Sequence, residues 1–167
     1  MGDTIENLNE AFAGESKANR IYLAYSRKAD AEGLTQVARL FKAAAEAETV
    51  HALNHLRTLG EVKSTVENLD TAIRGETFEF TEMYPEYISV ANEEGNRRAA
   101  WSFDVANKVE KIHAGLFSEA IEALRSGGGL LEVDYYVCEV CGNTVEREAP
   151  DKCPICGAPK TAFFKID

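Results

Sequence analysis

The sequence predicts a mainly α-helical protein: an antiparallel four-helix bundle followed by a small, β-rich metal-binding module. First, apolar residues recur every three or four positions along four long segments that precede the "SGGG" stretch at 126–129. Second, a Glu-x-x-His pair in the second segment recurs in the fourth. Third, all four cysteines follow the "SGGG" stretch, in two Cys-x-x-Cys pairs.

The first two helices have clear start and stop signals. Asp3 can cap the first helix with Glu6 as its capping-box partner, and Gly33 should end that helix. The second helix is expected over about residues 35–59, with Gly60 as its stop. The two helices should therefore form a hairpin with a short turn.

The third and fourth helices form a second predicted hairpin. The "STVE" segment at 64–67 is a plausible capping box for the third helix. Pro85 should kink this helix because proline removes one backbone donor. Gly95 separates it from the fourth helix, whose apolar stripe includes Phe103 and Phe117.

The character of the chain changes at the glycine-rich stretch 126–129, which is a flexible break. The remaining residues are punctuated by glycine and proline, and they are too few to fold on a hydrophobic core alone. We therefore expect two domains, a helical bundle at 1–127 and a metal-stabilised module at 128–167.

An internal repeat relates the two helical hairpins. "ETVH" at 48–51 matches "EKIH" at 110–113, and "GE" at 14–15 matches "GE" at 75–76. Each hairpin thus carries a Gly-Glu in one helix and a Glu-x-x-His in the other. Two hairpins related in this way are typical of an antiparallel four-helix bundle.

The repeated acidic and imidazole groups fall within the apolar stripes, so each helix directs at least one ionisable group toward the core. Burying several unpaired carboxylates together would be prohibitive without bound cations. A Glu from each of two helices plus Glu-x-x-His from each of the others suits two transition-metal ions. One such pair alone would more often be a solvated surface pair. The candidate ligands are Glu15, Glu48, His51, Glu76, Glu79, Glu110 and His113.

The cysteines predict a second metal site. "CEVC" at 138–141 and "CPIC" at 153–156 are each followed by a glycine that permits a tight turn. Four thiolates at this spacing bind a tetrahedral metal, either zinc or a single iron, and the spacing does not choose between them. The predicted ligands are Cys138, Cys141, Cys153 and Cys156.

The net charge and the lengths of the apolar runs limit the classes of partner that the protein is expected to bind. A net charge of −10 argues against nucleic acid and anionic membranes, because phosphates would repel this surface. No apolar run is long enough to cross a bilayer, and the N-terminal residues do not resemble a signal peptide. A cytoplasmic protein is expected, in which reduced cysteines serve as metal ligands.

The motifs "AFAGES", "ETVH", "GETFEFTEMYP", "EKIH" and "YVCEVCG…CPICGAPK" closely resemble those of rubrerythrins over nearly the whole chain. The resemblance implies a ferritin-like di-iron bundle joined to a rubredoxin-like domain. It also implies a peroxidase that reduces hydrogen peroxide to water in an anaerobe or microaerophile. By this resemblance the seven helical candidates hold two iron ions, bridged by oxide or hydroxide when oxidised, and the four cysteines hold one iron, for which zinc can substitute.

The resemblance also implies finer roles. Glu79 has no counterpart in the first hairpin, where Ala18 stands; in rubrerythrins this extra carboxylate replaces the histidine corresponding to His51 when the irons are oxidised. Tyr22 and Tyr84 match tyrosines that hydrogen-bond ligand carboxylates, although each could equally be an ordinary core tyrosine. A separate reductase, fed by NAD(P)H, is the implied electron donor. A homodimer or higher homo-oligomer is the implied assembly, in which one subunit's rubredoxin-like domain lies near the other's di-iron site.

Two alternatives remain open from the sequence. The bundle could be a ferroxidase or oxidase that reacts with dioxygen. The chain could also be a non-enzymatic iron-binding protein whose cysteine module is a structural zinc ribbon.

Overall fold

The computed structural model describes residues 2–167, which fold as two compact units, one ending at Lys63 and the other spanning Ser64–Asp167. The first unit is a helical hairpin, and the second combines helices with a small antiparallel sheet. The predicted fold class, mainly α with a small C-terminal β domain, is confirmed. None of the helices within residues 2–167 is both long and apolar enough to span a membrane.

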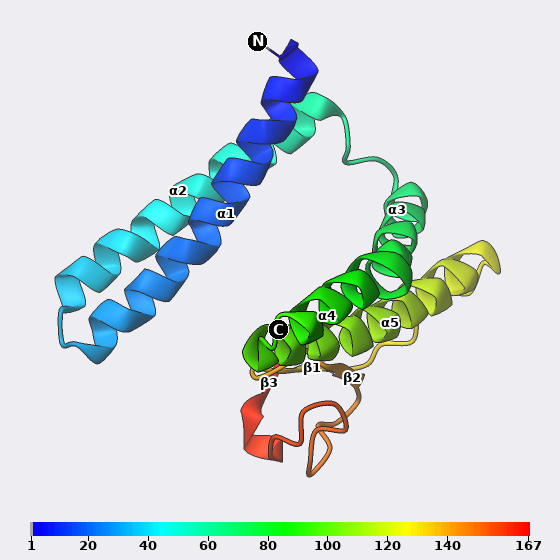
Figure 1. The fold of residues 1–167 in the computed structure, drawn as a ribbon. Coiled ribbons are helices and arrows are strands. Elements are labelled where there is room, and N and C mark those ends of the chain that lie inside the picture. Colours follow the sequence, from blue (N-terminus) through cyan, green and yellow to red (C-terminus); the bar gives the residue numbers. More distant parts are fainter. Residues whose placement is uncertain (1) are drawn as a thin grey trace. The chain divides into compact units, whose positions relative to one another are not determined.

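The first unit consists of α1 (Thr4–Ala31) and α2 (Thr35–Leu59), which run side by side as an antiparallel pair (Figure 1). The predicted capping box is present, since the Asp3 side chain accepts from the Glu6 backbone and the Glu6 side chain accepts from the Asp3 backbone. Gly60 adopts a left-handed conformation at the end of α2 (φ 72°), which glycine tolerates best.

Small side chains on α2 allow α1 and α2 to pack closely. Ala38, Ala45 and Ala52 are buried and recur every seven residues along α2. On α1 the buried Asn19 Nδ2 donates to the Ala45 carbonyl at 2.7 Å, and the buried Ser26 Oγ donates to the Ala38 carbonyl at 2.9 Å. These hydrogen bonds satisfy two buried polar side chains and fix the register of the hairpin.

The second unit begins with α3 (Thr65–Phe78), a π-helical turn η1 (Glu79–Met83) and α4 (Tyr84–Glu93), followed by α5 (Arg97–Arg125). Ser64 and Glu67 form the predicted capping box of α3. The kink expected at Pro85 takes the form of the π-helical turn directly before it. Proline supplies no backbone N–H, so the regular hydrogen-bond ladder cannot continue through this position.

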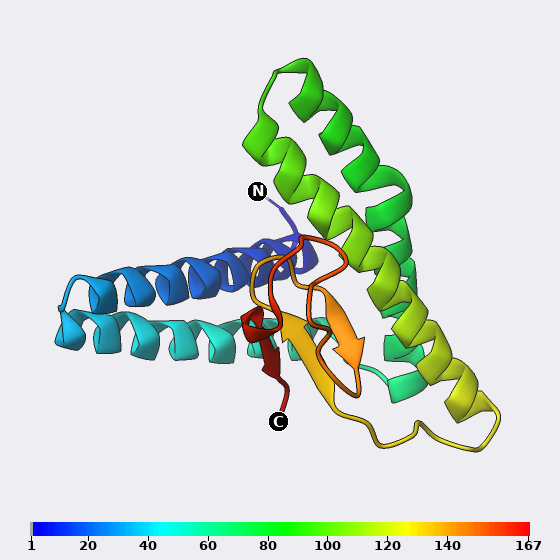
Figure 2. The same ribbon diagram turned by 90° about the horizontal axis from the view of Figure 1, so that it is seen from below.

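The C-terminal sheet has three short antiparallel strands in the order β2-β1-β3: β1 (Tyr135–Cys138), β2 (Thr144–Glu146) and β3 (Phe163–Lys165). A 3₁₀ turn η2 (Lys160–Ala162) precedes β3. Strand β2 contacts α5, and the sheet lies beside that helix (Figure 2). The sheet and α5 thus belong to one compact unit, whereas the domain division predicted at 127/128 stays a prediction.

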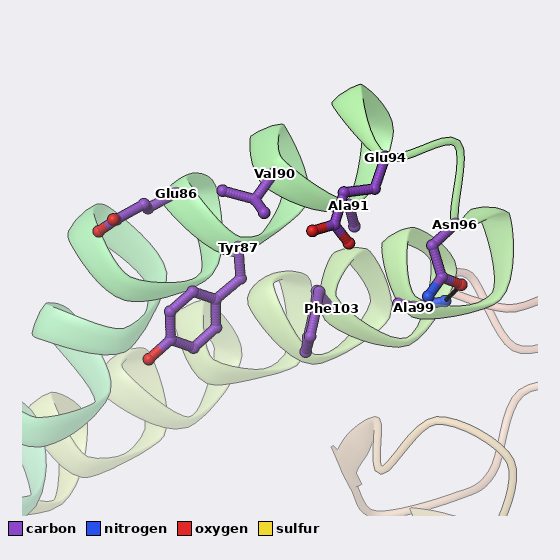
Figure 3. A pocket seen from close by; sticks show the side chains of 8 residues that line it. All are labelled: Glu86, Tyr87, Val90, Ala91, Glu94, Asn96, Ala99 and Phe103. Carbon is purple, nitrogen blue, oxygen red and sulfur yellow. Dashed lines mark hydrogen bonds between the residues drawn. The ribbon is translucent and has the colours of Figure 1, made fainter.

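A groove of about 530 Å³ lies between α4 and α5, where the Tyr87 and Phe103 rings pack 5.5 Å apart (Figure 3). Its other lining residues include Val90 and Ala91 on α4 and Ala99 on α5. None of its lining residues is a predicted metal ligand.

The alanine contact in the first unit yields a stability prediction. Ala45→Leu should destabilise the protein by about 1–3 kcal/mol, because the larger side chain cannot fit where Ala45 is only 1% exposed. Ala47→Leu is the matched control, since Ala47 is exposed on the same helix. Urea unfolding followed by circular dichroism measures both, and equal unfolding midpoints would contradict the close packing of α1 on α2.

Candidate metal centres

The first unit brings together three of the predicted ligands, Glu15 on α1 and Glu48 and His51 on α2. One potential ligand atom from each lies within 4.8 Å of the others. His51 Nδ1 is 2.8 Å from Glu48 Oε2 and 3.9 Å from Glu15 Oε1. The Glu-x-x-His spacing places Glu48 and His51 on one face of α2, so their contact is local. The contact between His51 and Glu15 joins α2 to α1.

The second unit contains the matching cluster, Glu76 on α3 with Glu110 and His113 on α5. His113 Nδ1 is 2.8 Å from Glu110 Oε2 and 3.9 Å from Glu76 Oε1. These distances equal those of the first cluster, so the sequence repeat is also a repeat of donor geometry. The cluster is mostly shielded from solvent, with side-chain exposures of 17% for Glu110, 22% for Glu76 and 27% for His113.

Burial and neighbouring negative charges disfavour the ionised form of Glu76 in the second cluster. Burial is the largest cause, followed by the charge of Glu110, the hydrogen bond to Glu110 and the charge of Glu79, and together they raise the pKa of Glu76 to about 7. At neutral pH this arrangement favours either a proton or a cation between the carboxylates. A divalent ion satisfies the same requirement with more charge and releases the proton.

Glu79 stands beside this cluster. It is the first residue of the π-helical turn η1, and its ligand atoms are not within the 4.8 Å group formed by Glu76, Glu110 and His113. Burial and the Glu110 charge raise the pKa of Glu79, while His113 lowers it. Glu79 is therefore close enough to interact electrostatically with the cluster.

The two predicted tyrosines have different surroundings. Burial raises the pKa of Tyr84, followed by the charges of Glu110, Glu79 and Glu76, which places Tyr84 near the second cluster. Tyr22 lies on α1 with its ring centroid 6.2 Å from that of Phe41. Their roles toward ligand carboxylates stay predictions.

The cysteines converge at distances suited to a metal. Cys138 Sγ is 3.8 Å from Cys156 Sγ, and Cys141 Sγ is 3.6 Å from Cys153 Sγ. A tetrahedral ion with metal–sulfur bonds of about 2.3 Å separates its sulfurs by about 3.8 Å, whereas a disulfide requires about 2.05 Å. The four thiols therefore surround the volume of a single tetrahedral ion.

Backbone turns and backbone N–H groups shape the four-cysteine site. Gly142 and Gly157 follow the two Cys-x-x-Cys pairs with φ of 81° and 80°, as the predicted tight turns require. Burial alone would raise the pKa of Cys153, but backbone N–H groups of Cys156 and Ile155 outweigh it and lower that pKa to about 7. Burial raises the pKa of Cys141 and that of Cys156, so Cys153 is the thiol of this group whose environment favours the metal-binding thiolate.

Two residues next to the cysteines were not identified from the sequence. Asn143 is 1% exposed, and its Nδ2 is 3.7 Å from Cys153 Sγ. Thr144 Oγ1 is 3.0 Å from His113 Nε2. Neither forms part of a motif, and the Thr144 contact joins residues 31 positions apart, so composition and spacing carry no signal for them.

Together these donors define a class: a helical protein with the carboxylate and imidazole groups of a di-iron centre, joined to a rubredoxin-like four-cysteine iron site. The family profile described as rubrerythrin matches residues 6–121, and that of the rubrerythrin rubredoxin-like domain matches residues 136–164. The chain belongs to the rubrerythrin family.

Individual relatives agree with this assignment. Rubrerythrin-2 of Clostridium acetobutylicum is 34% identical over 96% of this chain and 95% of its own. Nigerythrin of Nitratidesulfovibrio vulgaris is 36% identical over 98% of this chain and 86% of its own. Among solved structures, fully reduced, all-ferrous nigerythrin is similar with a TM-score of 0.59 and 33% identity, covering 99% of this chain and 88% of that one.

The Glu76 environment yields a pH prediction. A carboxyl whose pKa rises on folding from 4.5 to about 7 gives the folded state stability that is fully present below pH 4.5 and lost as pH rises toward 7. The thermal unfolding midpoint of the metal-stripped protein should therefore decrease as the pH is raised from about 5 to about 8. Glu76→Gln should flatten this slope, because the amide does not titrate.

Glu82→Gln is the control, since Glu82 is exposed one helical turn away from Glu79. Circular dichroism melts across this pH range provide the measurement. A slope that is the same in Glu76→Gln and in the unaltered protein would contradict the raised pKa assigned to the burial and charged neighbours of Glu76.

Proposed function

We propose that this protein is a non-haem di-iron peroxidase that reduces hydrogen peroxide to water and so limits oxidative damage. Electrons would reach the di-iron site through the four-cysteine iron. The supporting observation is that two different metal-binding chemistries occur in one compact unit, a Glu76–Glu110–His113 cluster and a tetrathiolate site. The first suits reaction with an oxygen ligand, and the second suits one-electron transfer.

In this proposal the Glu15–Glu48–His51 cluster and the Glu76–Glu110–His113 cluster supply the ligands of two iron ions. The ions supply electrons and the positive charge that stabilises both oxygens as the O–O bond breaks. The reaction consumes two electrons and two protons per peroxide and yields two water molecules. The protein's contribution is to hold the donors in place and to exclude competing ligands.

Glu79 is proposed to be the additional carboxylate ligand of the oxidised state. It lies beside the second cluster without belonging to its convergent group, so it is available for a change of ligand. A ferric ion prefers an anionic oxygen more strongly than a ferrous ion does. The π-helical turn that begins at Glu79 is a type of distortion often found at functional sites.

Tyr84, close to the same carboxylates, is proposed to hydrogen-bond one of them, and Tyr22 is proposed to do so in the other hairpin.

The proposed electron donor is a separate rubredoxin or reductase that oxidises NAD(P)H. The proposed assembly is a homodimer or a higher homo-oligomer in the cytoplasm. The net charge of −10 favours an electron donor with a basic docking surface.

The proposal predicts a preference between oxidants. Stopped-flow mixing of the fully reduced, iron-loaded protein should show much faster oxidation by hydrogen peroxide than by dioxygen at equal concentrations. The visible band of the ferric four-cysteine site should bleach on reduction and return on oxidation. Faster reaction with dioxygen would instead identify a ferroxidase or oxidase, and a colourless protein with zinc at the cysteines would identify the non-enzymatic alternative.

The ligand-exchange role of Glu79 is tested by Glu79→Ala. This variant should retain its iron and yet turn over peroxide about 10–100-fold more slowly, in the range expected when a group supporting a metal centre is lost. Glu82→Ala is the matched control, because Glu82 is exposed in the same π-helical turn. Iron content by elemental analysis and steady-state peroxide consumption provide the measurements. Unchanged turnover in iron-loaded Glu79→Ala would exclude the exchange of ligands.

A further inference from the structure

We propose that the side chain of Asn143 acts through Cys153 to raise the reduction potential of the iron held by the four cysteines. Asn143 is buried directly before β2, and its side-chain amide donates to the Cys153 sulfur. The potential of a thiolate-bound iron depends on the hydrogen bonds that its sulfurs accept. This role concerns the cysteine site alone, so it holds whichever oxidant reacts at the bundle.

The two Cys-x-x-Cys-Gly turns have matching backbone hydrogen bonds, in which Asn143 of the first turn corresponds to Ala158 of the second. The Asn143 carbonyl accepts from Cys138 N at 2.9 Å, and the Ala158 carbonyl accepts from Cys153 N at 2.7 Å. In each turn the residue after the glycine therefore closes the loop on the first cysteine of its pair. Alanine performs this backbone role in the second turn without any polar side chain.

The backbone N–H groups of the same two residues also correspond. Burial raises the pKa of Cys141, and the hydrogen bond from the Asn143 backbone lowers it. Burial likewise raises the pKa of Cys156, and the hydrogen bond from the Ala158 backbone lowers it. Asn143 and Ala158 thus make the same backbone contacts with their own cysteine pairs, and the two positions differ in the side chain alone.

The Asn143 side chain carries a cost that its backbone role does not explain. Its Nδ2 lies 3.7 Å from Cys153 Sγ in the other cysteine pair, while its buried Oδ1 has no hydrogen-bond partner among residues 2–167. The opposite orientation of the amide would direct its oxygen at a thiolate, which repels it. A buried, unpaired amide oxygen disfavours folding, and such groups in native proteins are often explained by a redox or catalytic role.

Charge gives the direction of the effect on the potential. When the iron at the cysteines is reduced it gains one electron, no covalent bond forms or breaks, and the thiolates carry more negative charge. The Asn143 amide adds to the backbone N–H groups of Cys156 and Ile155, which already donate to Cys153. A further donor stabilises the reduced site more than the oxidised one, and the buried surroundings strengthen this electrostatic effect. The Asn143 side chain therefore makes the iron easier to reduce.

Asn143→Leu tests this role, because leucine has nearly the same volume as asparagine and no donor. Spectroelectrochemical titration of the iron-loaded full chain, followed at the visible band of the ferric cysteine site, measures the potential. The equilibrium should shift about tenfold toward the oxidised site, which is a fall of about 59 mV for a one-electron couple. Asn143→Ala should shift it in the same direction and keep the turn, since alanine stands at position 158. Thr161→Val, at an exposed site of the module, is the control and should leave the potential unaltered.

A second measurement uses the unaltered protein and involves no redox chemistry. When the four cysteines hold cadmium-113, a proton that hydrogen-bonds a metal-bound sulfur shows scalar coupling to the metal in the NMR spectrum. One side-chain amide proton of Asn143 should show this coupling, and its exchange with solvent should be slow because the residue is buried. Absence of both the coupling and the slow exchange would show that the amide does not donate to Cys153, and would overturn the proposal.

Thermal unfolding of the zinc-loaded variants separates a redox role from a purely structural one. Asn143→Leu should keep the unfolding midpoint of the unaltered protein, because the apolar side chain also removes the unpaired oxygen. A lower midpoint with a shift in the redox equilibrium of less than twofold would identify a structural residue and overturn the proposal. A shift of less than twofold in both Asn143→Leu and Asn143→Ala would overturn it whatever their stability.

Discussion

The second unit depends on partly buried carboxylates that lie beside one another within a helical framework. Burial and the neighbouring Glu110 and Glu79 charges raise the pKa of Glu76 to about 7, so the second cluster is not stable as a set of bare anions. The same Glu, Glu and His arrangement recurs in the first unit with the same distances. The carboxylates of the second cluster therefore favour a bound cation, and metal binding there would contribute directly to folding.

This constraint accounts for several otherwise separate features. The Glu-x-x-His spacing puts an acid and an imidazole on one helical face, and the neighbouring helix supplies the other acid. The π-helical turn before Pro85 lies where an extra carboxylate, Glu79, is placed beside the cluster. The cysteine site differs, since backbone N–H groups lower the pKa of Cys153 and a bound metal takes the place of a hydrophobic core. The Thr144 side chain in β2 lies 3.0 Å from His113 Nε2, so the sheet contacts the second cluster.

Much of this organisation could be predicted from the sequence because its signals are local. The capping boxes at Asp3 and Ser64 and the glycine at position 60 set helix ends where they were expected. The cluster members were identified because the same spacing occurs twice. The π-helical form of the kink was not predictable, since Pro85 forbids a regular helix without specifying its replacement. The Thr144–His113 contact was missed because a lone threonine has no periodicity, and its partner becomes close only after the sheet packs on α5.

The proposed function requires two coupled irons with carboxylate and imidazole ligands and a third iron held separately by the four cysteines. Mössbauer spectroscopy of the oxidised protein loaded with iron-57 tests this most directly. The spectrum should contain two components in a ratio of about two to one, since there are two Glu-Glu-His clusters and one tetrathiolate site. The larger component should show antiferromagnetically coupled ferric ions with oxygen and nitrogen ligands, and the smaller a high-spin ferric ion with four sulfur ligands. A spectrum with only isolated ferric ions, or without the tetrathiolate component, would contradict it.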